Sequence, residues 1–157
     1  RLISGIKNSL LIDDTYNSSP RSAGEALQAL SLIEPKNFGK RFAVLGDMLE
    51  LGKQSEKLHR EIGSQVANLP IDYLVAVGAQ ARHFIHGAVE GGFSQDHTFH
   101  FDKSEQAGKF IQDKMGEGDV ILIKGSQGVR CEKITKELMA EPARAKELLV
   151  RQYKPWV

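Results

Sequence analysis

Two adjacent carboxylates, Asp13 and Asp14, directly follow a short apolar run at residues 10–12. That run is typical of a buried strand, and the polar residues 16–20 after it are typical of a turn into a helix. Ligands of open α/β sheets lie at the carboxyl ends of strands, so one carboxylate there could bind a metal ion or a ribose diol. Asp is also common in turns, where it binds nearby backbone N–H groups. That structural alternative stays open for both residues, and more so for Asp13.

A second polar motif, Lys124-Gly125-Ser126, follows a β-branched strand predicted at 120–123 and precedes a helix. Glycine allows a ligand to approach the backbone closely, and the N–H groups at a helix start suit an anion. The alternative is a simple turn with a solvated lysine. The longer glycine-framed loop of nucleotide-hydrolysing P-loops is missing before Lys124.

The glycine-containing loop at residues 46–52 follows another predicted strand. Its glycines lack the spacing of a dinucleotide-binding turn, which argues against a dinucleotide cofactor. Asp47 and Glu50 in this loop either meet a cation or cap the next helix.

The histidines do not form a convincing metal site. His83 and His86 share a predicted helix face without an acidic or cysteine partner nearby, and His97 and His100 point to opposite faces of a short strand. His59 is predicted to be a surface or interface residue. No metal ligand set is therefore predicted in this chain.

Composition describes an ordinary globular domain. The chain has 157 residues, of which 41% are hydrophobic and 26% charged, with 21 basic and 20 acidic side chains. This balance gives no electrostatic case for nucleic acid, and no apolar run is long enough to insert into a membrane. Cys131 is the only cysteine, which suits a reducing cytoplasm and a packing role. The chain begins at Arg1 without Met, so we expect it to be a piece of a longer protein.

The hydrophobic pattern alternates between strand and helix about five times. Strands are predicted at 2–6, 9–13, 41–45, 71–77, 98–101 and 120–123. Helices are predicted at 20–33, starting with Pro20 after a Ser18 or Ser19 cap, and at 55–69, 79–89, 104–115 and 129–139. The core strands are apolar throughout, which indicates an α/β fold with a mostly parallel sheet and helices on both faces. An antiparallel strand is expected at the N-terminal edge. We predict one domain at 1–140 and a tail at 141–157 that is helical to about residue 152.

Several motifs occur in a specific order. They are IDDTYN at 12–17 with Pro20, VLGDMLELG at 44–52 with His59 and Gly63, Val77-Gly78, and Lys124-Gly125-Ser126 with Glu132. Together they resemble the carboxyl-terminal domain of Mur ligases, most closely the MurF type. The resemblance runs from Arg1 to about Leu138.

The resemblance implies a Rossmann-like lid domain of a cytoplasmic enzyme of peptidoglycan synthesis. MurF-type ligases use ATP to convert the terminal carboxylate of a UDP-N-acetylmuramoyl-tripeptide into an acyl phosphate. The amine of D-alanyl-D-alanine then attacks, giving an amide, ADP and phosphate. The P-loop and the Mg²⁺ ligands belong to a central domain outside this chain, so the isolated domain is expected to be inactive. The missing N-terminal and central domains are its implied partners.

The resemblance also assigns roles to residues. Asp14 is similar to the ribose-binding carboxylate, with Tyr16 and Asn17 lining the cleft and Arg1 reaching the phosphates. The motif at Lys124, Gly125 and Ser126 resembles the loop that faces the substrate.

Two features complete the expected site. Gly78 and Arg82 lie where related ligases bind the incoming amino donor. Gln127 replaces a usual arginine, which removes a charge beside the substrate loop.

Two alternatives come from other functional classes. A phosphoacceptor receiver domain also carries an acidic pair after its first strand and a lysine after its last. It needs a further Asp at the end of the middle strand, where this chain has Val77-Gly78. The second alternative is a non-catalytic nucleotide-binding module. Titration with ATP, acetyl phosphate and D-alanyl-D-alanine distinguishes the three.

Overall fold

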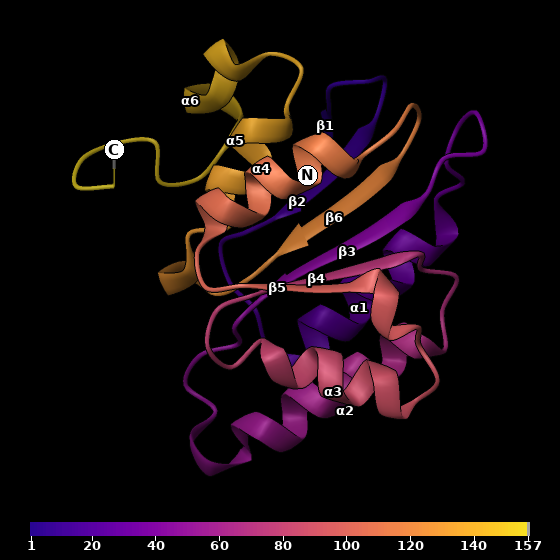
Figure 1. Ribbon diagram of the computed structural model, residues 1–157. Coiled ribbons are helices and arrows are strands. Elements are labelled where there is room, and N and C mark those ends of the chain that lie inside the picture. The colour runs from indigo at the N-terminus through magenta and orange to yellow at the C-terminus, as the bar shows by residue number, and fades with distance from the viewer. Residues whose placement is uncertain (157) are drawn as a thin grey trace.

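The apolar run at 10–12 forms the first part of β2, and β2 lies in a sheet that spans the molecule (Figure 1). The computed structural model describes residues 1–156, and within them the sheet has six strands in the order β1-β2-β6-β3-β4-β5. Only the pairing of β1 with β2 is antiparallel, as predicted for the N-terminal edge. The strands are β1 (Leu2–Ser4), β2 (Leu10–Asp14), β3 (Arg41–Gly46), β4 (Tyr73–Val77), β5 (Thr98–Phe101) and β6 (Val120–Lys124).

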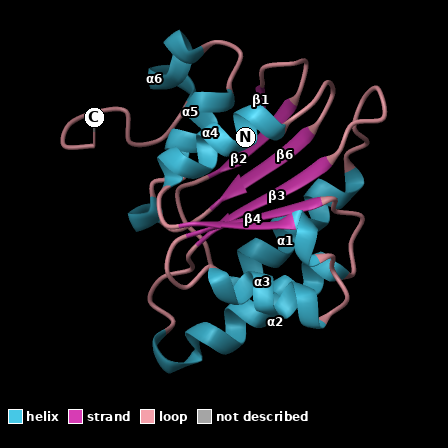
Figure 2. Ribbon diagram, viewed as in Figure 1, coloured by secondary structure: helices cyan, strands magenta, loops and turns pink. Residues whose placement is uncertain are grey.

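Helices cover both faces of the sheet (Figure 2). One face carries α1 (Pro20–Leu32), α2 (Ser55–Ala67) and α3 (Arg82–Glu90), and the other carries α4 (Ser104–Lys114), α5 (Glu132–Leu138) and α6 (Ala145–Leu148). Short 3₁₀ turns occur at Gly52–Gln54, Gln95–His97, Gln127–Val129 and Pro142–Arg144. The predicted α/β, Rossmann-like fold class is confirmed. Among the described residues, none of the helices combines the length and apolarity that crossing a bilayer requires.

Successive residues of the central strands point to opposite faces, and both faces are buried. In β6, Val120 and Leu122 pack with α1, α2 and α3, whereas Ile121 and Ile123 pack with α4 and α5. All four side chains are at most 2% exposed. This two-sided burial explains why the strand is apolar without alternation.

The start of α1 follows the predicted cap. The backbone N–H of Ser22 donates to Oγ of Ser19 at 3.1 Å, and the backbone N–H of Ser19 donates to Oγ of Ser22 at 2.9 Å. Pro20 occupies the first turn, where its missing N–H leaves no unpaired donor. This reciprocal capping fixes the direction in which the chain leaves the carboxyl end of β2.

Three predicted helices are shorter than the pattern indicated. The predicted helix at 79–89 begins only at Arg82, because residues 78–81 form a loop around the carboxylate of Asp47. The predicted helix at 129–139 begins at Glu132, because Arg130 has a left-handed φ of 60°. In the tail, α6 ends at Leu148, shortly before Arg151 takes a φ of 55°. A left-handed residue interrupts the helical hydrogen bonding, so neither helix includes it.

The tail packs onto the domain. Ala145 is 3% exposed and Leu149 is 8% exposed, and both belong to the apolar core beneath α4 and α5. The boundary between a domain at 1–140 and a tail at 141–157 stays a prediction, and residue 157 lies outside the described residues.

Candidate functional site at the carboxyl edge of the sheet

Asp14 and Lys124 are neighbours at the carboxyl edge of the sheet. They end the parallel strands β2 and β6 and are partners in the strand register. Both have even numbers, so their side chains leave the same face as Ile12 and Leu122, the face that α1 covers. Nζ of Lys124 donates to Oδ2 of Asp14 at 2.7 Å. Strand pairing therefore brings together two residues that are 110 positions apart in the sequence.

The Lys124 side chain is nearly inaccessible, whereas that of Asp14 is not. The lysine side chain is 2% exposed and the aspartate side chain is 46% exposed. The ammonium also donates to the carbonyl oxygen of Asn17 at 2.9 Å. Lys124 therefore orients both Asp14 and the loop after β2, and its ammonium does not face solvent.

Asp13 points to the opposite face and has structural partners. Its Oδ1 accepts from Oγ1 of Thr135 in α5 at 2.6 Å and from Oγ1 of Thr15 at 3.2 Å. Burial raises the pKa of the Asp13 carboxyl above 3.8, against the lowering effect of the two hydroxyl donors. The structural alternative holds for Asp13, and Asp14 is left as the accessible carboxylate of the pair.

A cavity of about 210 Å³ lies between three loops at this edge. It is lined by Tyr16, Asn17, Leu49, Glu50, Ser126 and Gln127. Oγ of Ser126 accepts from the backbone N–H of Leu49 at 3.0 Å and donates to the carbonyl of Ser18 at 3.4 Å. Ser126 therefore joins the loops that follow β2, β3 and β6.

Gly125 is required by close packing. A Cβ atom at this position would lie 2.7 Å from Sγ of Cys131 and 3.1 Å from Cα of Gly46. Cys131 is fully buried there, and burial raises the pKa of its thiol to about 12. The predicted packing role of the cysteine is confirmed.

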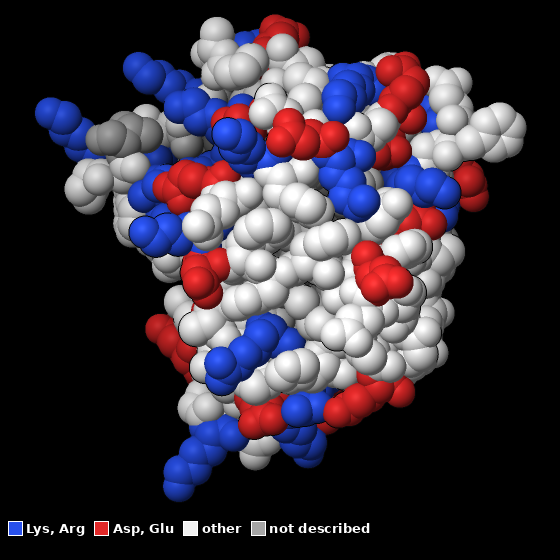
Figure 3. All heavy atoms as spheres, viewed as in Figure 1, with Lys and Arg blue, Asp and Glu red and all other residues white. Residues whose placement is uncertain are grey.

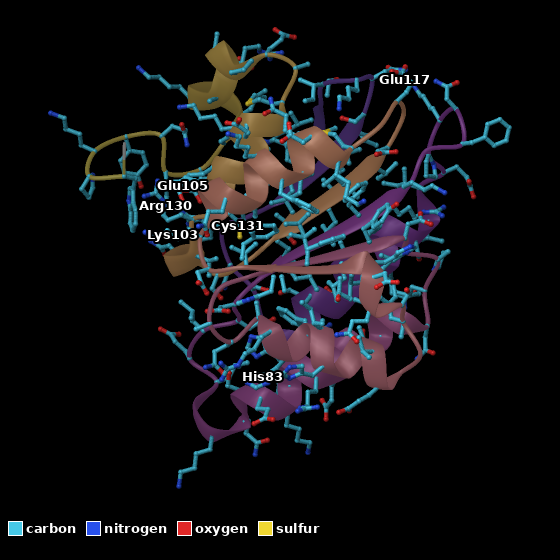
Figure 4. The ribbon with its side chains drawn as sticks, in the orientation of Figure 1. His83, Lys103, Glu105, Glu117, Arg130 and Cys131 are labelled. Atoms are coloured by element: carbon cyan, nitrogen blue, oxygen red, sulfur yellow. The ribbon has the colours of Figure 1, made fainter. Side chains whose placement is uncertain are left out.

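A second cavity, of about 340 Å³, opens beside the ends of β3, β4 and β5. Gly78 and Asp47 line it, together with the charged residues Asp102, Lys103, Glu105, Arg130 and Lys133. Figure 4 shows Lys103, Glu105 and Arg130 together at one end of the sheet, with Glu117 at the other. Arg82 is exposed at the start of α3 and is not among the described residues that line this cavity. The structure therefore brings Gly78 to the carboxyl edge and leaves Arg82 outside the cavity.

Asp47 does not cap α2, the next helix along the chain, because its carboxylate is engaged at the loop before α3. Its Oδ1 accepts from the backbone N–H of Ala81 at 2.7 Å, and burial raises the pKa of its carboxyl above 3.8. Gly78 has a φ of 114°, and a Cβ atom there would lie 2.5 Å from the Asp47 carboxylate. Asp47 therefore holds the loop between β4 and α3. Among residues 1–156, no three His, Cys, Asp or Glu side chains are grouped to hold a metal ion.

Arg1 lies beside β2, but its guanidinium is engaged elsewhere. Its backbone pairs with Asp13, because the Asp13 N–H donates to the Arg1 carbonyl at 2.8 Å. Its Nη1 donates to the carbonyl oxygens of Glu147 at 3.2 Å and Leu148 at 2.5 Å, in α6. The arginine is thus at the predicted edge of the sheet with its side chain directed to the tail.

His59, predicted to be a surface or interface residue, is 0% exposed. Its Nε2 accepts from the backbone N–H of Met48 at 3.0 Å, and its Nδ1 donates to the carbonyl of Ser55 at 2.7 Å. Burial lowers the pKa of this imidazole below 6.5, so it is neutral at neutral pH. His59 holds the start of the loop that contains Leu49. Gly63, one turn further along α2, was a sequence feature that could have indicated this burial. It lies where α3 packs so closely that a Cβ atom would lie 1.9 Å from the carbonyl oxygen of Phe84.

A buried ion pair in the tail also escaped sequence reasoning. Arg151 and Glu132 have side chains 2% and 0% exposed, with Nη2 of the arginine 2.9 Å from Oε2 of the glutamate. The sequence offers no periodic signal for a contact between a helix start and an irregular tail.

Comparison with known proteins agrees with this geometry. The sequence model of the family described as Mur ligase, glutamate ligase domain, matches residues 1–127. The chain belongs to the Mur ligase family. The resemblance drawn from the motifs is therefore confirmed for most of the chain.

Relatives of this Mur ligase domain include two curated bacterial proteins. The UDP-N-acetylmuramoyl-tripeptide–D-alanyl-D-alanine ligase of Bacillus subtilis is 34% identical over 132 residues, which are 84% of this chain and 28% of that protein. The protein of the same name from Escherichia coli is 31% identical over 134 residues, 84% of this chain and 27% of that protein. The domain thus spans under a third of their length.

Solved structures give the same relationship. MurF from Acinetobacter baumannii superposes with a TM-score of 0.73 at 32% identity, covering 86% of this chain and 29% of that one. MurF ligase from Thermotoga maritima in complex with ADP superposes with a TM-score of 0.66 at 30% identity, covering 82% of this chain and 27% of that one. The Mur ligase domain is therefore similar to MurF enzymes in both sequence and fold.

Proposed function

We propose that this chain is the lid domain of an ATP-dependent amide ligase that adds D-alanyl-D-alanine to a UDP-N-acetylmuramoyl-tripeptide. The terminal carboxylate of the tripeptide attacks the γ-phosphorus of ATP, forming an acyl phosphate and releasing ADP. The amine of D-alanyl-D-alanine attacks the acyl carbon, forming the amide and releasing phosphate and a proton. The names of the relatives and the ADP bound to the Thermotoga protein support this proposal.

The single observation that carries the proposal is that the Asp14 carboxylate is oriented by Lys124 and still has one oxygen free. Its Oδ2 is held by Lys124, and among residues 1–156 no hydrogen-bond donor reaches its Oδ1. A partly exposed carboxylate with one oxygen free can accept hydrogen bonds from ribose hydroxyls. Lys124 fixes the carboxylate in place, so little conformational freedom is lost on binding.

Tyr16, Asn17 and Arg1 complete the nucleotide side of the site. The Tyr16 side chain is 63% exposed and lines the smaller cavity together with Asn17. The Arg1 guanidinium donates to carbonyl oxygens of α6. To bind the phosphates of the nucleotide, it has to give up these neutral acceptors for the charged phosphate oxygens. Domain closure onto the nucleotide would supply these oxygens and would exclude water from the reacting groups.

The loop at Gly125 and Ser126 faces the substrate in this proposal, with Lys124 behind it as the group that orients Asp14. The larger cavity beside Gly78 has both acidic and basic walls, which suits a zwitterionic amino donor. Arg82 stays a predicted donor-binding residue that lies outside that cavity.

The resemblance to Mur ligases implies that the P-loop and the Mg²⁺ ligands belong to the central domain of the longer protein, and we expect the groups that perform the chemistry there. Magnesium bound there would neutralise phosphate charge as it develops. The residues of the lid bind, orient and shield the reactants.

The test uses the full-length protein that contains this chain. We expect phosphate release from ATP only when both the tripeptide nucleotide and D-alanyl-D-alanine are present. Asp14→Asn should raise KM for ATP about tenfold while the variant stays folded, because one charge-assisted hydrogen bond is lost. The matched control is Asp113→Asn, which alters an exposed carboxyl in α4. Phosphate release that ignores D-alanyl-D-alanine, or an unchanged KM in Asp14→Asn, rejects the proposal.

A receiver-like signalling function has no comparable support. β4 ends at Val77 and Gly78 follows it, so the position where a receiver accepts its phosphoryl group has no carboxylate. Acetyl phosphate should leave the chain without a covalent phosphoryl group, as judged by intact mass.

A further inference from the structure

We propose that Arg151 is a positioning residue that ties residues 149–156, here called the strap, to the loop at residues 15–17. Through this contact it holds Tyr16 and Asn17 at the rim of the smaller cavity. The inference rests on the proposed function, in which that loop contacts the nucleotide.

Arg151 bridges the loop and α5 from a buried position. Its Nη2 donates to the carbonyl oxygen of Thr15 at 2.5 Å and to Oε2 of Glu132 at 2.9 Å, and its Nε donates to Oε1 of Glu132 at 3.2 Å. Its side chain is 2% exposed, and that of Glu132 is 0% exposed. Charge-assisted hydrogen bonds out of contact with water fix geometry more strongly than bonds at the surface. The carbonyl that precedes Tyr16 is thereby fixed relative to α5.

The strap is held on both sides of this contact. Leu149 is buried in the core before it, and Nη2 of Arg130 donates to the carbonyl of Trp156 at 2.8 Å after it. The guanidinium of Arg151 lies 5.9 Å from the centre of the Tyr16 ring and 5.8 Å from that of Trp156. Figure 1 shows the C-terminal segment beside the end of the sheet where β2 and β6 finish. The strap is thus attached beside the edge that carries the site, through Thr15 and Arg130.

A role in stability alone explains this arrangement poorly. A buried ion pair generally stabilises a fold no more than packed apolar side chains would. Here Nη1 of Arg151 is buried without an acceptor among residues 1–156, which adds a further penalty. Specific placement of the loop is what the guanidinium supplies and an apolar side chain cannot. Arg151 and the rest of the strap lie beyond residue 127, where the match to the family model ends.

The experiment compares Arg151→Met with Arg144→Met in the full-length protein. Arg144 lies in the same tail, but its side chain is 47% exposed and pairs with Glu147. We expect Arg151→Met to speed hydrogen–deuterium exchange in the peptide spanning residues 10–19. We also expect KM for ATP to rise about tenfold with kcat within about twofold, because loop placement affects binding before chemistry. Arg144→Met should change neither quantity.

A second variant keeps the test decisive if Arg151→Met fails to fold. In Arg151→Met, the buried Glu132 carboxylate keeps Arg130 as its charged partner. Adding Glu132→Gln removes that buried charge, and the same loosening of the loop is expected. Unchanged exchange at residues 10–19 overturns the inference, whatever the enzyme does. Suppose that Arg151→Met raises exchange but leaves KM for ATP constant, while Asp14→Asn still raises KM. The strap then does not position the site, and the proposed function stands. If Asp14→Asn has no effect either, the proposed nucleotide site itself fails.

Discussion

Nζ of Lys124 lies 2.7 Å from Oδ2 of Asp14, yet the lysine side chain is 2% exposed and the aspartate side chain 46% exposed. The two ends of this ion pair therefore stand in different surroundings. Removing the exposed end leaves a buried ammonium whose one remaining acceptor among residues 1–156 is the Asn17 carbonyl. Removing the buried end leaves a carboxylate that water can reach. The pair should respond asymmetrically to mutation.

Asp14→Ala should lower the free energy of unfolding by about 2 kcal/mol, because an uncompensated charge remains buried. Lys124→Met should change it by less than about 1 kcal/mol while raising KM for ATP, because Asp14 loses the group that orients it. Urea unfolding followed by circular dichroism measures both. Arg21→Met, which breaks an ion pair whose side chains are 90% and 66% exposed, is the control and should be neutral. Equal losses in the two site variants would contradict this account.

Asp13 should make the domain less stable as pH rises through the acidic range. Burial raises the pKa of its carboxyl above 3.8, so the folded state holds the proton more tightly than the unfolded state. Stability from the protonated form is complete below 3.8 and is lost as pH passes the raised pKa. Asn at this position keeps an oxygen for the Thr135 hydroxyl and has no proton to lose.

Asp13→Asn should therefore gain melting temperature relative to the unmodified protein as pH rises above 3.8 and through the raised pKa. Thermal melts at several pH values give the difference, with Asp113→Asn as an exposed carboxyl control. A difference that is constant with pH would mean that Asp13 titrates alike in both states.

Gly125→Ala should destabilise the domain by about 1–3 kcal/mol, because its Cβ would overlap Sγ of Cys131. Combining it with Cys131→Ala removes the sulfur and should recover part of the loss. The recovery is partial, since Cα of Gly46 lies 3.1 Å from the same Cβ position. A double-mutant cycle by urea unfolding measures the coupling, and additive losses would show that the sulfur is not the obstacle.

Local sequence signals were enough for much of the fold. The uninterrupted apolar run at 120–123 predicted a strand buried on both faces, and Ser19 with Pro20 predicted the start of α1. These features depend on residues close together in the chain. The grouping of polar loops at one edge followed from the parallel sheet, because the carboxyl ends of parallel strands meet there.

Contacts between distant segments could not be predicted in this way. The pairing of Asp14 with Lys124 depends on the insertion of β6 between β2 and β3. The residues next to Lys124 in the sequence therefore could not show that its side chain is buried. The bond from Arg151 to Thr15 joins residues 136 positions apart, through a part of the chain without periodicity. On the face of the molecule that Figure 3 shows, basic and acidic side chains are interspersed.

His59 should make the domain less stable as pH falls. Its Nε2 accepts from the backbone N–H of Met48, and burial lowers the pKa of its ring below 6.5. Protonation would place an N–H on Nε2 facing the backbone N–H of Met48, which is unfavourable because both are donors. The unfolded state therefore binds the proton more readily than the folded state. Stability is therefore complete above 6.5 and is lost as pH falls through the lowered pKa of the folded state.

His59→Gln should be less stable by about 1–3 kcal/mol at neutral pH, because the N–H of Met48 loses its acceptor. This deficit should shrink as pH drops below 6.5, where the unmodified protein weakens and the variant does not. Urea unfolding across that range measures it, with the exposed His97→Gln as control. A deficit that stays constant would show that His59 is not the titrating group. Because the same loop continues to Leu49, whose N–H donates to Ser126, KM for ATP should rise along with the loss of stability.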